Sequence, residues 1–249
     1  MKYSKLHTFG DSFTMGSGLR GDAVEPFYPY QAKYTDHIWA TILGKKLNLE
    51  VNNTGVGGVS NEDILFSLNC GMQFLGKNPL IIVGLTAPTR LSMKFNKPND
   101  HWGGLTLVPH LYEKYMESGS DFLGEFRNFF TKEELDSFVA YYGALFPKHS
   151  NANWNYYAYL CIQLQNYFTN IGTRFIIWDY TLWTEFETIY QWSGGELNDL
   201  HWSPNGNHDF ANFMEYCIKI EAPYASFDEL VLWRKGEGRD ITQELYEYY

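Results

Sequence analysis

The stretch Lys5-Leu6-His7-Thr8-Phe9-Gly10-Asp11-Ser12 decides the fold. Residues 5–9 form a short run with alternating apolar side chains, which indicates a buried β-strand that ends in a turn carrying Ser12. Three further short apolar runs follow at Leu49–Asn53, Leu80–Gly84 and Arg174–Asp179. Helical patterns separate these runs. The sequence therefore predicts an α/β fold with a central parallel sheet and right-handed crossovers.

Four helices are predicted from apolar periodicity. Residues 38–47 and 64–74 each repeat apolar side chains on one helical face, and Ser60 or Asn61 is expected as the N-cap of the second helix. A third helix is predicted over 154–168. The fourth begins at Pro204 or Asn205, ends near Ile220 and turns its apolar side chains inward, namely Phe210, Phe213, Met214 and Cys217.

One long segment interrupts the alternation of strands and helices. Residues 88–153 are rich in Gly, Pro and aromatic side chains, and we interpret them as a mostly helical and loop insertion over the rim of the sheet. Within it, Thr131 and Glu134 predict a capping box for a helix over 132–145. The insertion is either a lid or a surface elaboration. Residues 222–249 form a C-terminal extension that packs on the domain or contacts a partner, and residues 1–249 are expected to form a single domain.

Composition excludes several function classes. The 249 residues carry a formal net charge of -10, which argues against nucleic-acid binding and against an anionic membrane surface as partner. The three cysteines lie in apolar stretches without metal-like spacing, so buried free thiols are expected. We expect a soluble protein, without signal peptide or membrane span, that is cytoplasmic by default. The oligomeric state stays open.

Polar or glycine-rich turns follow three of the predicted strands. Ser12, Gly55–Ser60 and Thr86–Arg90 should meet at one rim, because ligands of parallel sheets bind beyond the carboxyl ends of the strands. Far along the chain stands Asp199-Leu200-His201. A serine at a strand end, with an acid and a histidine distant in sequence, fits a nucleophile and base that folding assembles. The sequence therefore predicts an enzyme that attacks an acyl group.

Four blocks in order make the pattern specific. Residues 10–16, which begin Gly-Asp-Ser, resemble the first block of the SGNH (GDSL) hydrolases, and residues 53–58 resemble the second. Residues 83–86 occupy the place of the third block, with Thr86 where Asn is usual. Residues 199–201 resemble the last block, and the form Asp-x-His-Trp is similar to that of alginate-acetylating members. The resemblance implies a flavodoxin-like three-layer α/β/α sandwich.

The resemblance also implies residue roles. Ser12 would be the nucleophile, His201 the general base and Asp199 the group that orients His201, with Asn198 as the alternative because the usual spacing falls on it. The oxyanion hole would use the N–H groups of Ser12 and Gly58 and the side chain of Thr86. Arg90 or Asn53 stays open as a replacement for Thr86.

Further contacts are expected at the same rim. Asn53, Arg90 and Trp202 are candidate substrate-binding residues, although Arg90 could instead pair with a rim carboxylate and Trp202 could simply pack the last helix. No metal site is expected, since His101 and His110 lack ligand spacing, and no organic cofactor is implied.

Three functions remain. The first is a serine esterase acting on a small acyl ester, with acetyl on a carbohydrate as the favoured example. This example rests on the Asp-x-His-Trp form and on the 18% of aromatic residues, which either line a groove that stacks on sugar rings or pack the core and surface. The second is an O-acyltransferase that uses the same residues. The third is a non-catalytic glycan-binding or assembly protein on a hydrolase scaffold. Association with a phage or virion would suit the first function.

Overall fold

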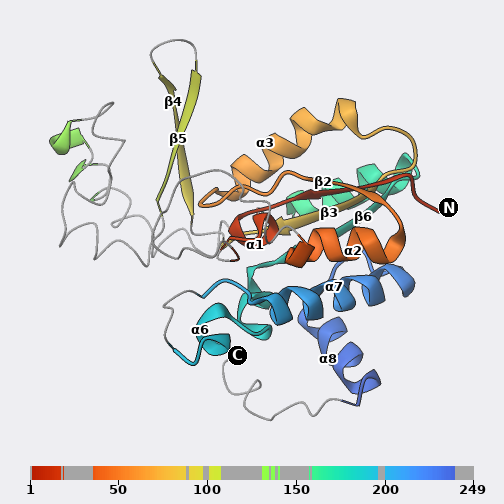
Figure 1. Cartoon of the computed structure of the whole chain (residues 1–249). Coiled ribbons are helices and arrows are strands. Elements are labelled where there is room, and N and C mark those ends of the chain that lie inside the picture. The colour runs from red at the N-terminus through yellow and green to blue at the C-terminus, as the bar shows by residue number, and fades with distance from the viewer. Residues whose placement is uncertain are drawn as a thin grey trace.

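The structure is a computed structural model of the whole chain (Figure 1). It describes residues 2–17, 19, 36–87, 90–97, 101–107, 131–134, 136, 137, 140, 157, 159–195 and 200–238.

A parallel sheet forms the centre of the molecule. Its strands are β1 (Lys5–Phe9), β2 (Glu50–Asn53), β3 (Leu80–Leu85) and β6 (Arg174–Asp179), in the order β2-β1-β3-β6. All neighbouring pairs run parallel, with Leu6 opposite both Val51 and Leu80. The four strands predicted from apolar runs are thereby confirmed to within one residue at either end.

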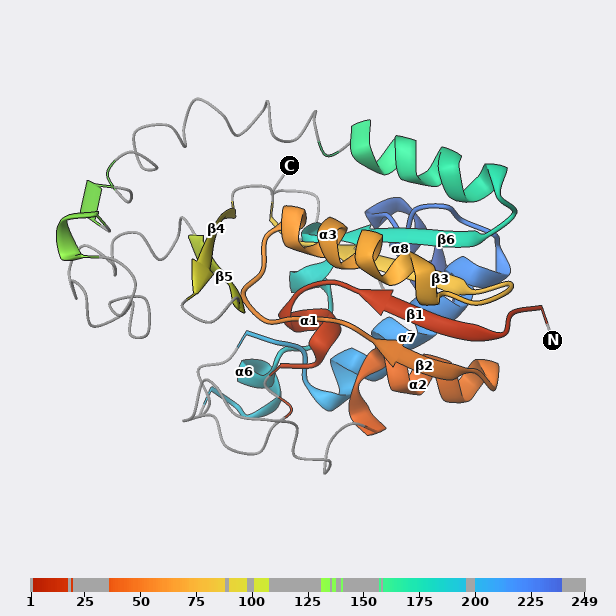
Figure 2. The ribbon, with the colours of Figure 1, turned by 90° about the horizontal axis from the view of Figure 1, so that it is seen from above.

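Helices cover both faces of this sheet (Figure 2). On one face lie α2 (Trp39–Leu47), α7 (Pro204–Lys219) and α8 (Phe227–Gly236), and on the other lie α3 (Asn61–Gly71) and the helix over 159–170. The predicted three-layer α/β/α architecture is therefore confirmed. Short helical turns complete the connections: α1 (Ser12–Met15), η2 (Met72–Phe74), η5 (Tyr180–Glu185) and α6 (Ile189–Trp192).

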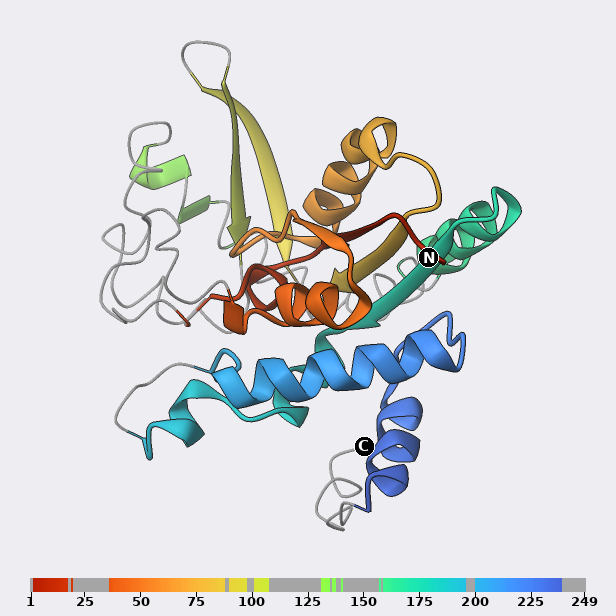
Figure 3. The same ribbon diagram turned by 45° about the vertical axis from the view of Figure 1, so that its right-hand side comes forward.

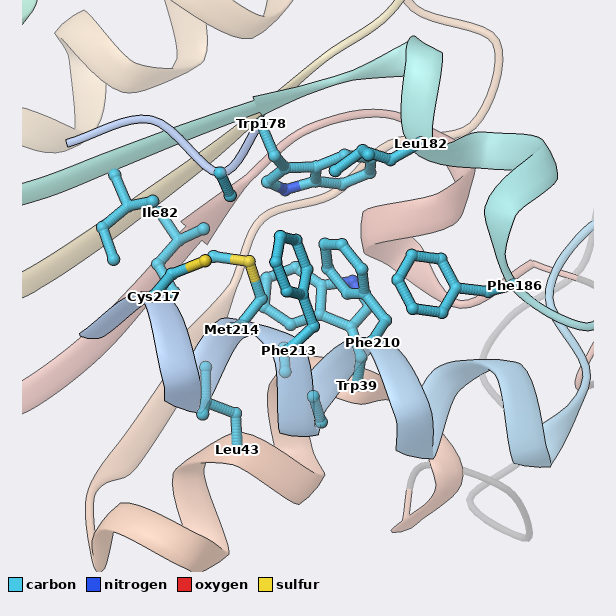
Figure 4. Close-up of a cluster of buried hydrophobic side chains, with 14 of the residues drawn as sticks. Trp39, Leu43, Ile82, Trp178, Leu182, Phe186, Phe210, Phe213, Met214 and Cys217 are labelled. Carbon is cyan, nitrogen blue, oxygen red and sulfur yellow. The ribbon is translucent and has the colours of Figure 1, made fainter. Parts of the chain in front are cut away.

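Two apolar clusters hold the layers together because strand side chains alternate between the faces. Leu80 and Ile82 pack toward α2 and α7, whereas Ile81 and Val83 pack toward α3. Aromatic rings fill the first cluster (Figure 4): Trp178 packs against Phe210 with ring centroids 4.9 Å apart. The four inward side chains predicted for α7 are all fully buried, and these are Phe210, Phe213, Met214 and Cys217.

Helix starts follow the capping rules. Ser60 is the N-cap of α3, and the Ser60 hydroxyl accepts from the backbone N–H of Asp63 while the Asp63 carboxylate accepts from the Ser60 N–H. The predicted capping box of Thr131 and Glu134 is also present, with the Thr131 N–H 2.8 Å from Glu134 Oε2. Residues 132–134, 136, 137 and 140 are helical, and the other residues of the helix predicted over 132–145 lie outside the described residues.

The 88–153 segment holds a β-hairpin that the sequence analysis missed. Strands β4 (Leu91–Lys97) and β5 (His101–Leu107) pair antiparallel in full register, from Leu91 opposite Leu107 to Lys97 opposite His101. The hairpin extends from the end of the sheet that carries α1 (Figure 3). The sequence does carry a signal for this hairpin. Apolar and polar residues alternate strictly over 91–96, and the turn residues Pro98-Asn99-Asp100 follow.

The segment after residue 222 packs onto the domain through residue 238. Backbone hydrogen bonds join it to β6, since Ala225 N–H donates to Ile177 C=O at 2.7 Å, and Leu230 and Trp233 of α8 are buried. The prediction of three buried thiols was wrong for Cys70, which is exposed on the outer face of α3, whereas Cys217 is buried and Cys161 is half-buried. None of the helices in the described residues combines the length and apolar character of a membrane span.

Candidate active site

Ser12 lies at the carboxyl end of β1, at the first position of α1. Asp11 caps this short helix, and its carboxylate accepts a hydrogen bond from the Phe13 N–H at 3.0 Å. Gly10 permits the tight turn, because a Cβ there would lie 2.0 Å from Thr14 Oγ1. Ser12 itself is 8% exposed. The serine is thus held on a rigid strand-to-helix turn, and the N–H groups of a first helical turn have no partner within the helix.

The glycine turn after β2 lies against this serine. A Cβ on Gly57 would lie 3.9 Å from Ser12 Cβ, and one on Gly55 would lie 2.4 Å from the backbone nitrogen of Met15. Val56 N–H donates to Gly10 C=O at 3.0 Å. Gly58 has φ 73°, a left-handed conformation that favours glycine, and a Cβ there would meet nothing within 4 Å. The second turn therefore touches α1 through glycines and leaves open space at Gly58.

Asn53 fastens that turn to α1. Its side-chain Nδ2 donates to Thr14 C=O at 2.8 Å, and its Oδ1 accepts from the Gly55 N–H at 3.0 Å. These contacts hold the second turn in place, and they give Asn53 a positioning role at the site.

Thr86 completes the rim at the end of β3. It is 1% exposed, and the Asn61 side chain grips its backbone from α3: Asn61 Oδ1 accepts from Thr86 N–H at 2.8 Å while Asn61 Nδ2 donates to Thr86 C=O at 2.7 Å. The Thr86 hydroxyl makes no hydrogen bond of regular geometry. Asn61 therefore fixes the position of Thr86 through its backbone, and the Thr86 hydroxyl is directed to the Asp11 carboxylate.

Arg90 and Asp11 form a buried ion pair next to Ser12. Arg90 Nη1 lies 3.6 Å from the Oδ2 of Asp11, and the side chains of Arg90 and Asp11 are 10% and 1% exposed. The Arg90 guanidinium also lies over the Trp183 ring at 5.1 Å and donates to Val59 C=O at 3.3 Å. Arg90 therefore pairs with the carboxylate of Asp11 beside Ser12, which was one of the two roles considered for Arg90.

Burial and charge act against each other at Asp11. Burial raises the pKa of its carboxyl above the usual value, and Arg90 and the Phe13 N–H hold that pKa down. The Thr86 hydroxyl and the charge of His201 lower it further, although Oδ2 of Asp11 makes no hydrogen bond of regular geometry. Asp11 thus interacts electrostatically with Arg90, Thr86 and His201.

His201 comes to the same end of the sheet from the opposite end of the sequence. Its ring centroid lies 5.0 Å from that of Phe13, the residue next to Ser12. The loop is held by Ile189, whose N–H donates to His201 C=O at 2.8 Å, and by Ser203, the N-cap of α7. Folding therefore brings His201 to the first turn. Asp199 and Asn198 lie outside the described residues.

Aromatic rings connect these parts. Phe13 stacks on Trp183 with centroids 4.7 Å apart, and Trp183 meets the edge of Tyr180 at 5.7 Å. Trp202 is 1% exposed, and its indole N–H donates to Trp183 C=O at 2.8 Å. Trp202 thus supports the site from within the core and offers no surface to a substrate.

The structure brings most of the predicted residues together: Ser12, Asn53, Gly58, Thr86, Arg90 and His201. Three participants were missed, namely Asp11 as a buried ionic partner, Asn61 and Trp183. Asn61 was considered only as a helix cap, and Trp183 follows a predicted strand end, which is the one signal that pointed to it. Among the described residues no three His, Cys, Asp or Glu side chains gather closely enough to hold a metal ion.

Comparisons with known proteins add little to this geometry. No family model matches the sequence, and no curated protein matches it. Over 86% of this chain and 98% of the other, the fold is similar to the solved structure of a proposed lipolytic protein of the G-D-S-L family from Desulfitobacterium hafniense DCB-2, with 12% identity and a TM-score of 0.38.

Proposed function

We propose that this protein is a serine ester hydrolase that acts on a small acyl ester through an acyl-enzyme on Ser12. The observation that carries the proposal is the position of Ser12, in a capped turn beside the Gly57 backbone and one residue from the Phe13 ring that His201 contacts. A serine hydroxyl is a weak nucleophile without an adjacent base, and the His201 imidazole packs on Phe13 at this rim. The resemblance to the SGNH blocks supports the same assignment.

The chemistry follows from these roles. His201 takes the proton of the Ser12 hydroxyl as its oxygen attacks the ester carbonyl carbon. The oxyanion that forms is stabilised by the N–H groups of Ser12 and Gly58 and by the Thr86 hydroxyl. The ester C–O bond then breaks, and His201 returns the proton to the leaving alcohol. Water, activated by His201, releases the acid from Ser12, and Asp199 orients the imidazole.

The aromatic content and the Asp-x-His-Trp form favour a carbohydrate as the alcohol half of the ester. The O-acyltransferase alternative uses the same steps with a sugar hydroxyl in place of water in the second half. It predicts turnover that rises when an acceptor alcohol is added.

The test is hydrolysis of p-nitrophenyl acetate by the wild-type protein and by Ser12→Ala and His201→Ala. We expect kcat/KM to fall about 10⁴-fold or more in both variants. Ser4→Ala and His208→Ala are matched controls that should keep the activity, because Ser4 is exposed just before the start of β1, at the other end of the strand from Ser12, and His208 is exposed on α7.

Two outcomes would contradict the proposal. Equal hydrolysis in wild type and variants would mean adventitious turnover. No hydrolysis, together with no labelling of Ser12 by a fluorophosphonate, would favour the non-catalytic binding or assembly function.

A further inference from the structure

A cavity of about 280 Å³ lies next to Thr86, on the face of the sheet covered by α3 and the helix over 159–170. An apolar cavity of roughly 150 Å³ is large enough for a benzene molecule, so this one has room for a chain of several carbons or a substituted ring. Its apolar walls come from aliphatic side chains and tyrosine rings: Leu85, Ile162, Pro223, Tyr157, Tyr180 and Tyr224.

Four polar side chains around this cavity already have partners in the protein. The Tyr224 hydroxyl donates to Asp179 Oδ2, and the Thr181 N–H donates to Asp179 Oδ1 at 3.0 Å. Gln165 Nε2 donates to Pro223 C=O at 2.9 Å, and the Tyr157 hydroxyl donates to Glu62 at 2.8 Å. A polar ligand would have to break these bonds, whereas a hydrocarbon would not. The lining therefore favours an apolar occupant.

Cys161 belongs to the same wall. Burial raises the pKa of its thiol to about 12, with the nearby Asp179 carboxylate adding to the effect. At neutral pH the thiol is therefore uncharged and lines the cavity as a small apolar group.

Two contacts join the cavity to the candidate active site. Thr86 lines the cavity, and its hydroxyl faces Asp11, the neighbour of Ser12. Tyr180 also lines the cavity, and its ring meets Trp183, which stacks on Phe13. Thr86 and the Tyr180–Trp183 ring pair therefore lie between the candidate active site and the cavity, so the two are adjacent.

The position of His201 indicates whether the acyl half or the alcohol half of an ester would enter the cavity. His201 packs on Phe13, a member of the apolar cluster on the α7 face, whereas Leu85, Cys161 and Tyr224 belong to the cluster on the α3 face. The leaving alcohol must face the imidazole that protonates it. The acyl chain is directed away from the imidazole, and the cavity lies on that side of the sheet.

We propose that this cavity binds the acyl chain of the substrate, and that the enzyme prefers an unbranched or aromatic acyl group larger than acetyl. This inference rests on the proposed function. Each methylene that enters an apolar site is worth about 0.8 kcal/mol, which corresponds to about fourfold in kcat/KM.

The experiment measures kcat/KM for p-nitrophenyl acetate, butyrate, hexanoate and decanoate. We expect a rise of at least tenfold from acetate to the best substrate, at butyrate or hexanoate, and a fall at decanoate. Cys161→Phe fills the cavity, so it should lower the ratio of kcat/KM for hexanoate to kcat/KM for acetate at least tenfold. Cys70→Phe places the same ring on the exposed side of α3 and should leave this ratio unchanged.

Different results overturn the two proposals. Ser12-dependent acetate hydrolysis with no gain for longer chains, or a Cys161→Phe variant that slows acetate and hexanoate equally, would overturn the acyl cavity and leave the esterase standing. If Cys161→Phe fails to fold, Ile162→Trp obstructs the cavity from a position that is 54% exposed, with the same expected loss. Absence of Ser12-dependent hydrolysis for all four esters would overturn both proposals.

Discussion

Asp11 occupies an unusual environment for a carboxylate beside a proposed nucleophile. It is 1% exposed, and the Arg90 guanidinium, 3.6 Å away and itself held over the Trp183 ring, opposes its charge. The free-energy cost of removing both charges from water offsets most of their mutual attraction. Removing one partner, however, leaves the other charge buried and unpaired. The pair therefore fixes Ser12 and the third turn relative to each other more than it stabilises the fold.

The variant Arg90→Met tests what happens when the Asp11 carboxylate loses this partner. We expect a loss of about 3 kcal/mol in the free energy of unfolding at pH 7, because the Asp11 carboxylate stays buried and unpaired. Urea denaturation measures it. The pKa of Asp11 is already raised above 3.8 in the folded protein, so native Asp11 binds protons more readily than unfolded Asp11. Its ionisation lowers stability as pH rises above 3.8, and the deficit of Arg90→Met should be smaller at pH 4.5 than at pH 7.

The double variant Asp11→Asn/Arg90→Met is the matched control. Asparagine keeps an oxygen that can accept from the Phe13 N–H and carries no charge. The double variant should recover part of the unfolding free energy that Arg90→Met loses at pH 7. A double variant that is less stable than Arg90→Met would show that the unpaired charge is not the cause.

At the scale of elements, the turns after the strands were predictable and the contacts between them were not. Strand ends and helix caps follow from local patterns, which is why Ser12, Gly58 and Thr86 were placed at one rim from sequence alone. The partners of Thr86 and Arg90 depend on how α3 and β1 pack, which no local pattern encodes. The hairpin of β4 and β5 was missed because its alternating pattern was read as part of a mixed loop, and Cys70 was misplaced because apolar neighbours surround it on an exposed helical face.

The start of α3 is the element on which the third turn depends. Asn61 is 2% exposed and satisfies both backbone groups of Thr86. Asn61→Leu is similar in size but leaves a buried N–H and a buried C=O without partners. We expect a loss of about 2 kcal/mol or more in the free energy of unfolding, together with slower p-nitrophenyl acetate hydrolysis, since Thr86 would move.

Asn69→Leu is the control for this prediction. It makes the same substitution on the same helix at an exposed position, and it should change stability by less than about 0.5 kcal/mol. Equal effects of the two variants in urea denaturation would contradict the role given to Asn61.

The two faces of the sheet carry different parts of the candidate site. The α7 face carries the aromatic cluster and the His201 loop, and the α3 face carries the clamp on Thr86 and the apolar cavity. Ser12 lies where the two meet, at the end of β1, which is an inner strand of the sheet. Anything that loosens β1 should therefore disturb stability and the site together.

His7 makes β1 sensitive to pH. It is 2% exposed, its Nε2 has no hydrogen-bond partner among the described residues, and its Nδ1 lies 3.3 Å from Asn52 Nδ2. Burial lowers the pKa of His7 below its usual 6.5, with Lys5 adding to the effect while Glu50 and the backbone of Leu75 oppose it. The folded protein thus binds a proton at His7 less readily than the unfolded chain does.

Protonation of His7 should lower the stability of the folded protein as the pH falls. The contribution of neutral His7 to stability is fully present above pH 6.5 and is lost as pH falls from 6.5 through the pKa of the folded state, at up to about 1.4 kcal/mol per pH unit. His7→Val removes the titrating group, so urea denaturation between pH 7.5 and 5 should give a flatter dependence of unfolding free energy on pH than in wild type. Thr8→Val, on the same strand and also fully buried, should shift the curve by a constant amount. Parallel curves for His7→Val and wild type would mean that His7 is not protonated on unfolding in this range, and the acid sensitivity of the fold would then have to come from another group.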